Sequence, residues 1–545
     1  MKTQKSQPNA SVKAFRAIAE GYYEEFFERF PTSGSAVGRA EFNGELEQPD
    51  EKLHARHLSL VRETLGAVQS LPESDFVTDD WLDRRAMMSE LRTELWSLER
   101  GTYRRNPELW ASGAISSIYN LIVKKADNIS GVADAVLSRL QKLPGYLEHA
   151  ASMIKDPVPL WKQMAIKSCE GAPALFDAIA IPLIETGKAP DAKVRRLTAN
   201  AKSAFEDFAK RVEKISPGKA GDFAVGTERF EALIRERLGW DLTVPEALAL
   251  GRTLAERFQA EMEQEARKFG RGKTPGEILD RAKADWKPQH GALIDEYRHQ
   301  TQYVRDAFKR AEIVSFPKNE KLSVKPVPDF LRHHFPTAAY SAPGCYERDQ
   351  TGIFWVNDLS LIRETQEEKQ AEIRQHFGLS ATCAHEAYPG HHLQFCTANR
   401  HPSKLRRLFA HAIFYEGWTL WCEKMTVDYK IAKEPTARLN QLHDALWRAH
   451  RIIIDCGLQT GKMSYADAVQ HLVKHVGFTR GRAEGDVNWY TSSPTVPMSY
   501  LLGRTELLRL KQKKVDVQGW SIKRFNDWIL SFGTIPWRWM ELSGL

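Results

Sequence analysis

The sequence predicts a mainly α-helical protein with one small β-sheet. Three observations support this expectation. Most of the chain spaces its apolar residues at the period of an α-helix, among strong helix-forming residues and with Pro or Gly between the segments. Residues 313–359 differ, because prolines are frequent there and apolar and polar residues alternate. The sequence shows no repeat of fixed period, so a repeat architecture is not expected.

The predicted helices follow one another along the chain. The first has helical apolar spacing over residues 14–30 and ends at Pro31. Residues 484–500 are expected to be rich in loops, and the tryptophan-rich tail at 520–539 is expected to pack into the core or against a helix. The further predicted helices cover residues 51–71, 81–99, 132–155, 190–215, 244–270, 275–286, 439–458 and 501–513.

Two segments between residues 313 and 359 have the alternation of β-strands. They read KLSVKPV and GIFWVND. Because they directly precede a histidine-rich stretch, we expect the sheet to lie beside an active-site helix. A sheet edge can hold an extended peptide by strand addition. A purely structural hairpin is the alternative.

The length of 545 residues exceeds one ordinary hydrophobic core. We expect an N-terminal helical region at 1–312 and a catalytic region at 313–545, interleaved as one unit. The contents of 42% hydrophobic and 27% charged residues are those of a globular protein. The net charge of +7 is small for this length, and no basic stripe or membrane-spanning apolar run occurs in the sequence. Neither a nucleic acid nor a membrane is therefore expected as a partner.

The six cysteines show no paired spacing. Cys383, Cys396 and Cys422 fall in apolar helical stretches and are interpreted as buried free thiols. The first residues, MKTQKSQPNASVKAF, carry positive charge but no apolar signal core. Together these features predict a cytoplasmic protein.

Residues 383–395, CAHEAYPGHHLQF, concentrate side chains that can bind a metal. His385, Glu386, His391 and His392 fall within eight residues. In the zinc motif H-E-x-x-H the two histidines bind the metal and the glutamate is the general base. The pattern is not met here, because Pro389 occupies the position four residues after His385.

Pro389 and Gly390 could bring a later histidine onto the same helix face as His385. Residues six apart do not share a face of a regular helix. Proline removes a backbone donor and glycine tolerates unusual backbone angles, so we expect a bulge inside the helix. The bulge would return His391 to the face of His385, so His391 is favoured as the second ligand. His392 is the alternative.

A third zinc ligand is expected from a later helix. Glu416 lies 31 residues after His385, in the apolar stretch AHAIFYEGWTLWCEKM. A carboxylate in such surroundings is costly unless it is paired or binds a metal. Glu423, one face repeat further along the helix, is the alternative. Asp455 in IIIDCGL could orient a ligand histidine, or it could be an ordinary polar residue near a helix end.

The stretch HEAYPGHHLQ, followed by FYEGW, resembles the bacterial "domain of unknown function 885" family. These are helical proteins grouped with glutamate-type zinc metallopeptidases. The resemblance extends over almost the whole chain, through FFERFPTSGSAVG, LPGYLEHA, APGCYERDQTGIFWVND, RIIIDCGL and SPTVPMSYLLGRTELLRL in this order. The chain departs from the family at Gln459, where members usually have His, and at 494–497, where a Pro-Gly-Gln segment is usual. The resemblance implies a large helical metallopeptidase-like architecture, with substrate choice as the property that these departures affect.

The motif and the resemblance together imply a zinc-dependent hydrolase that cleaves an amide bond in a peptide or a small amide-containing substrate. Glu386 is the expected general base for a zinc-activated water. Tyr500 in SYLLG is the expected hydrogen-bond donor to the oxyanion, and Tyr490 is the second choice. Alternatives are a hydrolase of non-peptide amides or esters and a non-catalytic binding protein on the same scaffold. The intact Glu386 favours an enzyme, because a structural zinc site needs no general base.

Overall fold

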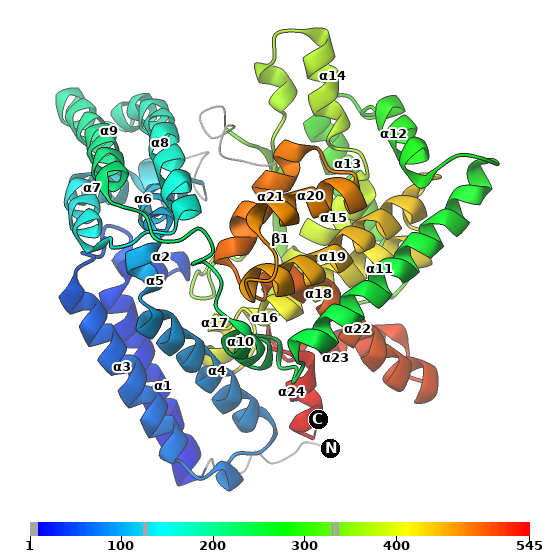
Figure 1. Ribbon diagram of the computed structural model, residues 1–545, viewed down its shortest axis with the longest axis horizontal. Coiled ribbons are helices and arrows are strands. Elements are labelled where there is room, and N and C mark those ends of the chain that lie inside the picture. Colours follow the sequence, from blue (N-terminus) through cyan, green and yellow to red (C-terminus); the bar gives the residue numbers. More distant parts are fainter. Residues whose placement is uncertain (1–8, 124–128, 329–331, 333–336, 545) are drawn as a thin grey trace. The chain divides into compact units, whose positions relative to one another are not determined.

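The computed structural model describes residues 9–123, 129–328, 332 and 337–544 of the chain (Figure 1). Within these residues α-helices dominate, and three strands form one sheet. The predicted fold class, mainly α with a small sheet, is confirmed. Across the described ranges, no helix combines the length and the apolar character that crossing a membrane requires.

The chain forms two compact units. Unit 1 runs from the N-terminus to Asp222 and also contains Gly344–Arg348 and Glu541–Leu545, and unit 2 comprises Phe223–Pro343 and Asp349–Met540. The proposed division at residue 312 falls inside unit 2, just before the sheet begins. All the candidate site residues named above belong to unit 2.

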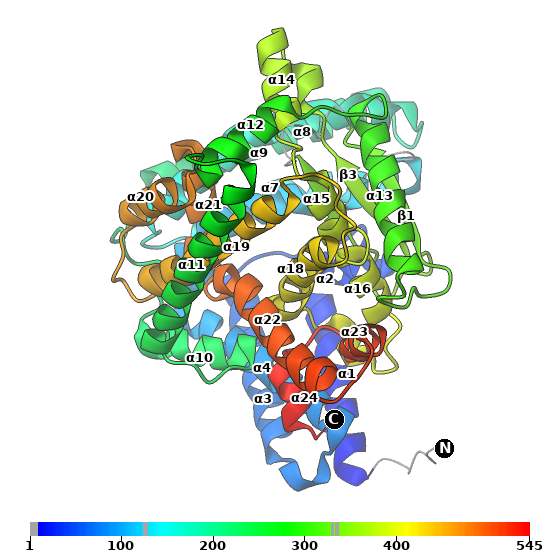
Figure 2. The same cartoon turned by 90° about the vertical axis from the view of Figure 1, so that its right-hand side faces the viewer.

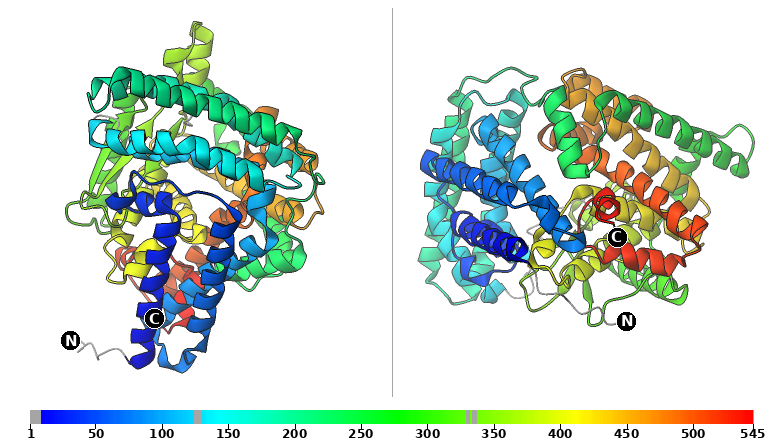
Figure 3. Two further views of the ribbon diagram at one scale, coloured as in Figure 1. Left: turned by 90° about the vertical axis from the view of Figure 1, so that its left-hand side faces the viewer. Right: turned by 90° about the horizontal axis from the view of Figure 1, so that it is seen from below.

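Unit 1 is a set of helices that pack through apolar stripes. In α9 (Asp191–Lys214) buried residues recur every three or four positions, as in Val194, Leu197 and Ala201. Figure 3 shows α9 running side by side with α8 (Pro159–Glu185), and Phe176 and Phe205 join the two with ring centroids 5.6 Å apart. The other helices of unit 1 are α1 (Ala10–Arg29), α2 (Pro31–Ala36), α3 (Glu51–Ser70), α4 (Thr78–Arg100), α5 (Thr102–Arg105), α6 (Pro107–Val123) and α7 (Ala133–Met153).

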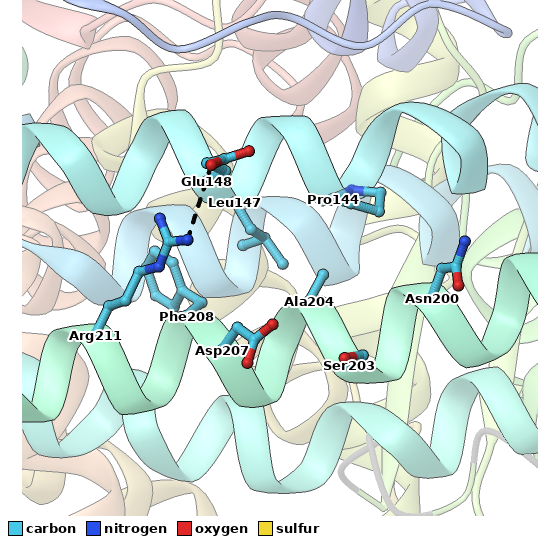
Figure 4. Close-up of a pocket in the computed structure, with 9 residues that line it drawn as sticks. All are labelled: Pro144, Leu147, Glu148, Asn200, Ser203, Ala204, Asp207, Phe208 and Arg211. Carbon is cyan, nitrogen blue, oxygen red and sulfur yellow. Dashed lines mark ion pairs between the residues drawn. The ribbon is translucent and has the colours of Figure 1, made fainter.

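A groove on unit 1 runs between α7 and α9 (Figure 4). The ion pair of Glu148 and Arg211, with 3.8 Å between Oε1 and Nη2, crosses it. Both side chains are more than half exposed, so this ion pair contributes little stability. The residues that line the groove include none of those that the sequence proposes for metal binding or catalysis.

Unit 2 is organised around two helix pairs. The first pair is α11 (Val244–Ala266) and α19 (Ala437–Gln459), which share a large buried apolar cluster (Figure 2). The second is α18 (Ala412–Asp428) and α22 (Val496–Lys511). The other helices after residue 222 are α10 (Thr227–Leu238), α12 (Pro275–Asp285), α13 (Leu293–Arg310), α14 (Gln366–Arg374), α15 (Leu379–Glu386), α16 (His391–Ala398), α17 (Lys404–Leu408), α20 (Tyr465–Val476), α21 (Arg480–Ser492), α23 (Ile522–Leu530) and α24 (Trp537–Leu542).

Helices α18 and α22 cross at two glycines. A Cβ atom at Gly503 would lie 2.1 Å from the backbone oxygen of Ile413, and one at Gly417 would lie 2.7 Å from the backbone of Gly503. A larger residue at either position would therefore force the helices apart. Glu416 and Tyr500 lie beside this crossing, one on each helix, and the close approach brings them together.

The helices predicted from the sequence are present, with ends that differ by a few residues. The prediction of loops over residues 484–500 is wrong, because α21 and the start of α22 occupy most of this range. The buried residues Ala483, Val487 and Tyr490 recur at helical spacing, and the Thr479 hydroxyl caps the first turn by accepting from Arg482 N. The expected packing of the tryptophan-rich tail is found for Trp537 and Trp539 of α24, which are buried, whereas Trp520 and Trp528 are partly exposed.

The sheet has the strand order β1-β3-β2. Strand β3 (Thr351–Val356) is central and almost fully buried, and it pairs parallel with β1 (Lys321–Pro326) and antiparallel with β2 (Ala338–Ser341). Strand β2 is thus an edge strand of this sheet. Helix α13 packs against β1 and α15. Figure 2 shows β1 and β3 next to these two helices.

Candidate metal centre

The structure brings His385, His391 and Glu416 into one cluster. One potential ligand atom from each lies within 4.8 Å of the other two. Glu416 Oε2 is 3.7 Å from His385 Nε2 and 3.8 Å from His391 Nε2. The side chains are 13%, 12% and 11% exposed in the same order, so the cluster is largely buried.

The chain between the two histidines breaks the helix rather than bulging within it. Helix α15 ends at Glu386, and α16 begins at His391 after a short loop that contains the cis peptide bond Tyr388–Pro389. The loop folds tightly over the end of α15, since a Cβ at Gly390 would lie 1.8 Å from the backbone oxygen of His385. Trp418 of α18 holds the loop by donating to the Pro389 carbonyl at 2.8 Å. The expected bulge inside one helix is therefore wrong, although the new helix does place His391 beside His385.

His392 points away from this cluster. It is fully buried, its Nε2 lies 3.0 Å from Glu320 Oε2, and its Nδ1 lies 3.1 Å from the Tyr340 hydroxyl. Glu320 also accepts from the Tyr388 hydroxyl at 2.6 Å and from Arg305 at 2.7 Å. His392 thus ties α16 to β2 and to the residue before β1, which is a structural position.

Replacement of His392 by alanine is expected to destabilise the protein without removing a potential metal ligand. The variant would leave the buried Glu320 carboxylate and the Tyr340 hydroxyl each short of one partner, at a cost of roughly 1–3 kcal/mol per unsatisfied group. Thermal unfolding of the metal-free protein should therefore begin at a lower temperature, and zinc content after reconstitution should equal that of the wild type. An unchanged unfolding temperature would contradict the structural role.

Glu423 orients the first histidine of the cluster. Its Oε1 lies 2.8 Å from His385 Nδ1, which leaves Nε2 of the same ring facing Glu416. A carboxylate on the far nitrogen is the usual support of a metal-binding histidine. Asp455, which the sequence suggested for this task, lies elsewhere, since its Oδ2 accepts from Met498 N at the start of α22.

Burial and the surrounding charges shift the pKa values of all three cluster residues. Burial and the nearby charge of His385 hold the pKa of His391 well below its usual range, so His391 keeps a free lone pair at neutral pH. Burial disfavours the charged form of His385, but the hydrogen bond to Glu423 and the adjacent carboxylates outweigh it and raise its pKa to about 9. Burial also raises the pKa of Glu416. Zinc prefers neutral imidazole and carboxylate ligands, so its binding would displace the proton of His385.

Two atoms of the cluster lack a hydrogen-bond partner. Nδ1 of His391 and Oε2 of Glu416 are buried, and neither finds a donor or acceptor within the described residues. Leaving buried polar atoms unsatisfied is costly. A divalent cation between the imidazole rings and Glu416 Oε2 would satisfy the carboxylate oxygen, so these residues fit a zinc ion.

Glu386 and Tyr500 adjoin the cluster, whereas Tyr490 does not reach it directly. Glu386 follows His385 at the end of α15, and the Tyr340 backbone N–H of β2 donates to its carboxylate. Tyr500 interacts with Glu416 across the helix crossing. The Tyr490 hydroxyl is fully buried and accepts from Arg451 Nε at 2.7 Å.

Sequence reasoning missed two neighbours of the cluster. Tyr340 stands on the edge strand, with its ring centroid 6.5 Å from that of His391. Arg451 contacts the Tyr500 ring from α19, with its Cζ 4.7 Å from the ring centroid. A tyrosine in a short strand and an arginine in an amphipathic helix have no distinguishing pattern in one sequence, so no signal could have found them.

A family comparison supports the resemblance seen in the sequence. The model of the family described as "Bacterial protein of unknown function (DUF885)" matches residues 31–542. The chain belongs to the DUF885 family. The link from this family to glutamate-type zinc metallopeptidases stays a prediction. No curated protein matches this DUF885 chain.

Two solved structures share the fold of this DUF885 protein. One is described as "a putative lipoprotein of unknown function from Shewanella oneidensis"; its TM-score is 0.77 at 20% identity, and the match covers 97% of this chain and 99% of that one. The other is described as "the putative lipoprotein from Colwellia psychrerythraea"; its TM-score is 0.73 at 15% identity, and the match covers 98% and 99%. At these identities the likeness shows the fold alone.

The descriptions of both structures use the word lipoprotein, and this overturns the prediction of a cytoplasmic location for the DUF885 chain. That prediction depended in part on cysteines without paired spacing. All six cysteines are thiols in the structure, and all but Cys345 are buried. Burial keeps such thiols apart and unreactive, so their free state does not indicate a reducing compartment.

Proposed function

We propose that this DUF885 protein is a zinc-dependent hydrolase that cleaves an amide bond in a peptide or a small amide-containing substrate. One observation carries the proposal. His385, His391 and Glu416 offer ligand atoms within 4.8 Å of one another, and Glu386 directly follows the first of them. Three protein ligands and an adjacent general base are typical of a catalytic zinc site, whereas a structural zinc site usually has four protein ligands.

Zinc held by these three residues would supply a Lewis acid that polarises the scissile carbonyl and lowers the pKa of water toward about 7. The remaining tasks belong to the chain. Glu386 accepts the proton of the attacking water, and Tyr500 donates a hydrogen bond to the oxygen that becomes negative. Glu423 keeps His385 Nε2 aimed at Glu416 through its bond to Nδ1.

The edge strand favours a peptide over an ester as the substrate. Strand β2 pairs with β3 on one side only, and its residue Tyr340 reaches Glu386 through its backbone N–H. An extended peptide added beside β2 would gain backbone hydrogen bonds that an isolated ester cannot make. A hydrolase of non-peptide amides or esters remains the alternative that a substrate screen separates.

The proposal is tested by metal analysis and a substrate screen. Purified protein is reconstituted with zinc, freed of excess metal, and incubated with a peptide mixture with and without a chelator. We expect one bound zinc ion and peptide cleavage that the chelator abolishes. Cleavage of amide or ester libraries without peptide cleavage would move the function to the alternative class. Stoichiometric zinc without hydrolysis of any library would leave a binding protein and overturn the proposal.

Tyr500→Phe is expected to lower kcat while zinc content stays unchanged. The substitution removes only the hydroxyl, which interacts with Glu416 and which we assign as donor to the oxyanion. Loss of one such donor costs about 2.7–4 kcal/mol of transition-state stabilisation, or roughly 10²- to 10³-fold in kcat. Tyr490→Phe serves as the comparison, because the Tyr490 hydroxyl is bound to Arg451. If the two variants lowered kcat equally, Tyr500 would not be the donor.

A further inference from the structure

Arg451 of α19 carries a buried donor that the described residues do not satisfy. The residue is 4% exposed, and its Nη1 finds no hydrogen-bond partner within the described part of the chain. Its Nε donates to the Tyr490 hydroxyl, whereas its Nη2 lies 3.9 Å from Asp486 Oδ1, beyond hydrogen-bonding distance. A buried cationic donor without a partner is costly. The position therefore favours the arrival of a hydrogen-bond acceptor.

Aromatic rings hold the guanidinium of Arg451 in place. Its Cζ lies 4.1 Å from the Trp447 ring centroid and 4.7 Å from that of Tyr500. Such cation–π contacts engage the faces of the guanidinium and leave its N–H edges free for other groups. Arg451 is thus fixed in orientation by two rings and by Tyr490, with one donor uncommitted.

Tyr500 connects Arg451 to the candidate metal centre. The tyrosine packs on the guanidinium and also interacts with Glu416, one of the three candidate ligands. The positive charges of Arg451 and Arg448 both act on the Glu416 carboxylate. Each arginine keeps one buried nitrogen without a hydrogen-bond partner among the described residues, Nε in Arg448 and Nη1 in Arg451. Arg448 pairs through Nη1 with Asp444 Oδ1 at 3.2 Å, whereas in Arg451 the terminal Nη1 is the uncommitted atom and the guanidinium packs on Tyr500 beside the site.

We infer that Arg451 forms a subsite for a free carboxylate of the substrate, so that the enzyme acts on peptides or amides with a carboxylate near the scissile bond. The inference rests on the proposed function. A guanidinium edge matches a carboxylate in geometry and charge. Glu386 and Glu416 make the surroundings unfavourable for a doubly charged phosphate.

The test uses the zinc-loaded full-length protein and two peptide libraries of identical sequence, one ending in a free carboxylate and the other in an amide. We expect kcat/KM for the acids to exceed that for the amides by roughly 10- to 100-fold, the range of one charge-assisted hydrogen bond. Arg451→Met should abolish this ratio chiefly by raising KM for the acids, with zinc content unchanged. Arg451→Lys keeps the charge without the planar fork and should restore part of the ratio.

Arg438→Met is the matched control. Arg438 lies on the same helix, and it pairs with Glu261 at 2.7 Å on another part of unit 2. This variant should keep the wild-type preference for acids. Equal cleavage of both libraries by the wild type would overturn the subsite and leave the proposed function intact. Cleavage of neither library by the zinc-loaded protein would overturn both. A preference that survives in Arg451→Met would show that the guanidinium only supports the fold.

Discussion

Glu386→Gln is expected to remove nearly all turnover while the protein keeps its zinc and its fold. Glutamine has the size of glutamate but cannot accept the proton of the attacking water. Burial, opposed by the charge of His385 and reinforced by Glu416 and Glu423, raises the pKa of Glu386 to about 7. A base with that pKa is suited to proton transfer near neutral pH. We expect kcat to fall by about 10²- to 10⁴-fold, measured on the substrate that the screen identifies.

The control for this variant is a buried glutamate outside the candidate site. Glu506 on α22 is 2% exposed and accepts from Arg538 at 2.8 and 2.9 Å. Glu506→Gln weakens this pair, so it should lower stability and leave kcat close to the wild-type value. Near-normal kcat in Glu386→Gln would remove the general-base role and, with it, the peptidase-like mechanism. Loss of zinc from Glu386→Gln would instead indicate that Glu386 is a metal ligand.

The fold was predictable where the apolar period is long and Pro or Gly marks the ends. The helix predicted at 190–215 became α9, because its buried residues keep a regular spacing of three or four over the whole length. The region after residue 479 was misjudged, because α21 buries little besides Ala483, Val487, Tyr490 and Thr491 and leaves its other faces polar. Such a helix depends on its neighbours more than on its own pattern.

The candidate site was predictable in its residues and less so in its geometry. The cluster of His385, His391 and Glu416 follows from residue types that an apolar stretch does not tolerate without a partner. The break between α15 and α16 lies at Pro389 and Gly390, but the hydrogen bond from Trp418 that holds the loop comes from another helix and could not be foreseen. The supporting role of Glu423 is equally non-local, since only the packing of α18 against α15 brings it to His385 Nδ1.

His385→Ala, His391→Ala and Glu416→Ala are each expected to strip the zinc and to reduce hydrolysis to the level seen with chelator. The reason is the geometry of the cluster, in which Glu416 Oε2 lies 3.7 and 3.8 Å from the two histidine nitrogens. Removal of one ligand leaves two, fewer than the three protein ligands of known catalytic zinc sites. Zinc content is measured on the purified variants after dialysis against a weak chelator, together with unfolding temperature to confirm the fold.

Two further variants test whether zinc affinity depends on the residues that contact the ligands. Glu423→Gln keeps its shape but weakens the support of His385, and such supporting changes typically cost 10- to 100-fold in metal affinity. It should therefore retain zinc in metal-rich buffer and lose it to a chelator that the wild type resists. His392→Ala should hold zinc as tightly as the wild type, because its ring contacts Glu320 and Tyr340 instead of the cluster. A stoichiometric zinc ion in both His385→Ala and Glu416→Ala would refute the ligand assignment. If His392→Ala lost zinc and His391→Ala kept it, His392 would be the ligand and His391 would not.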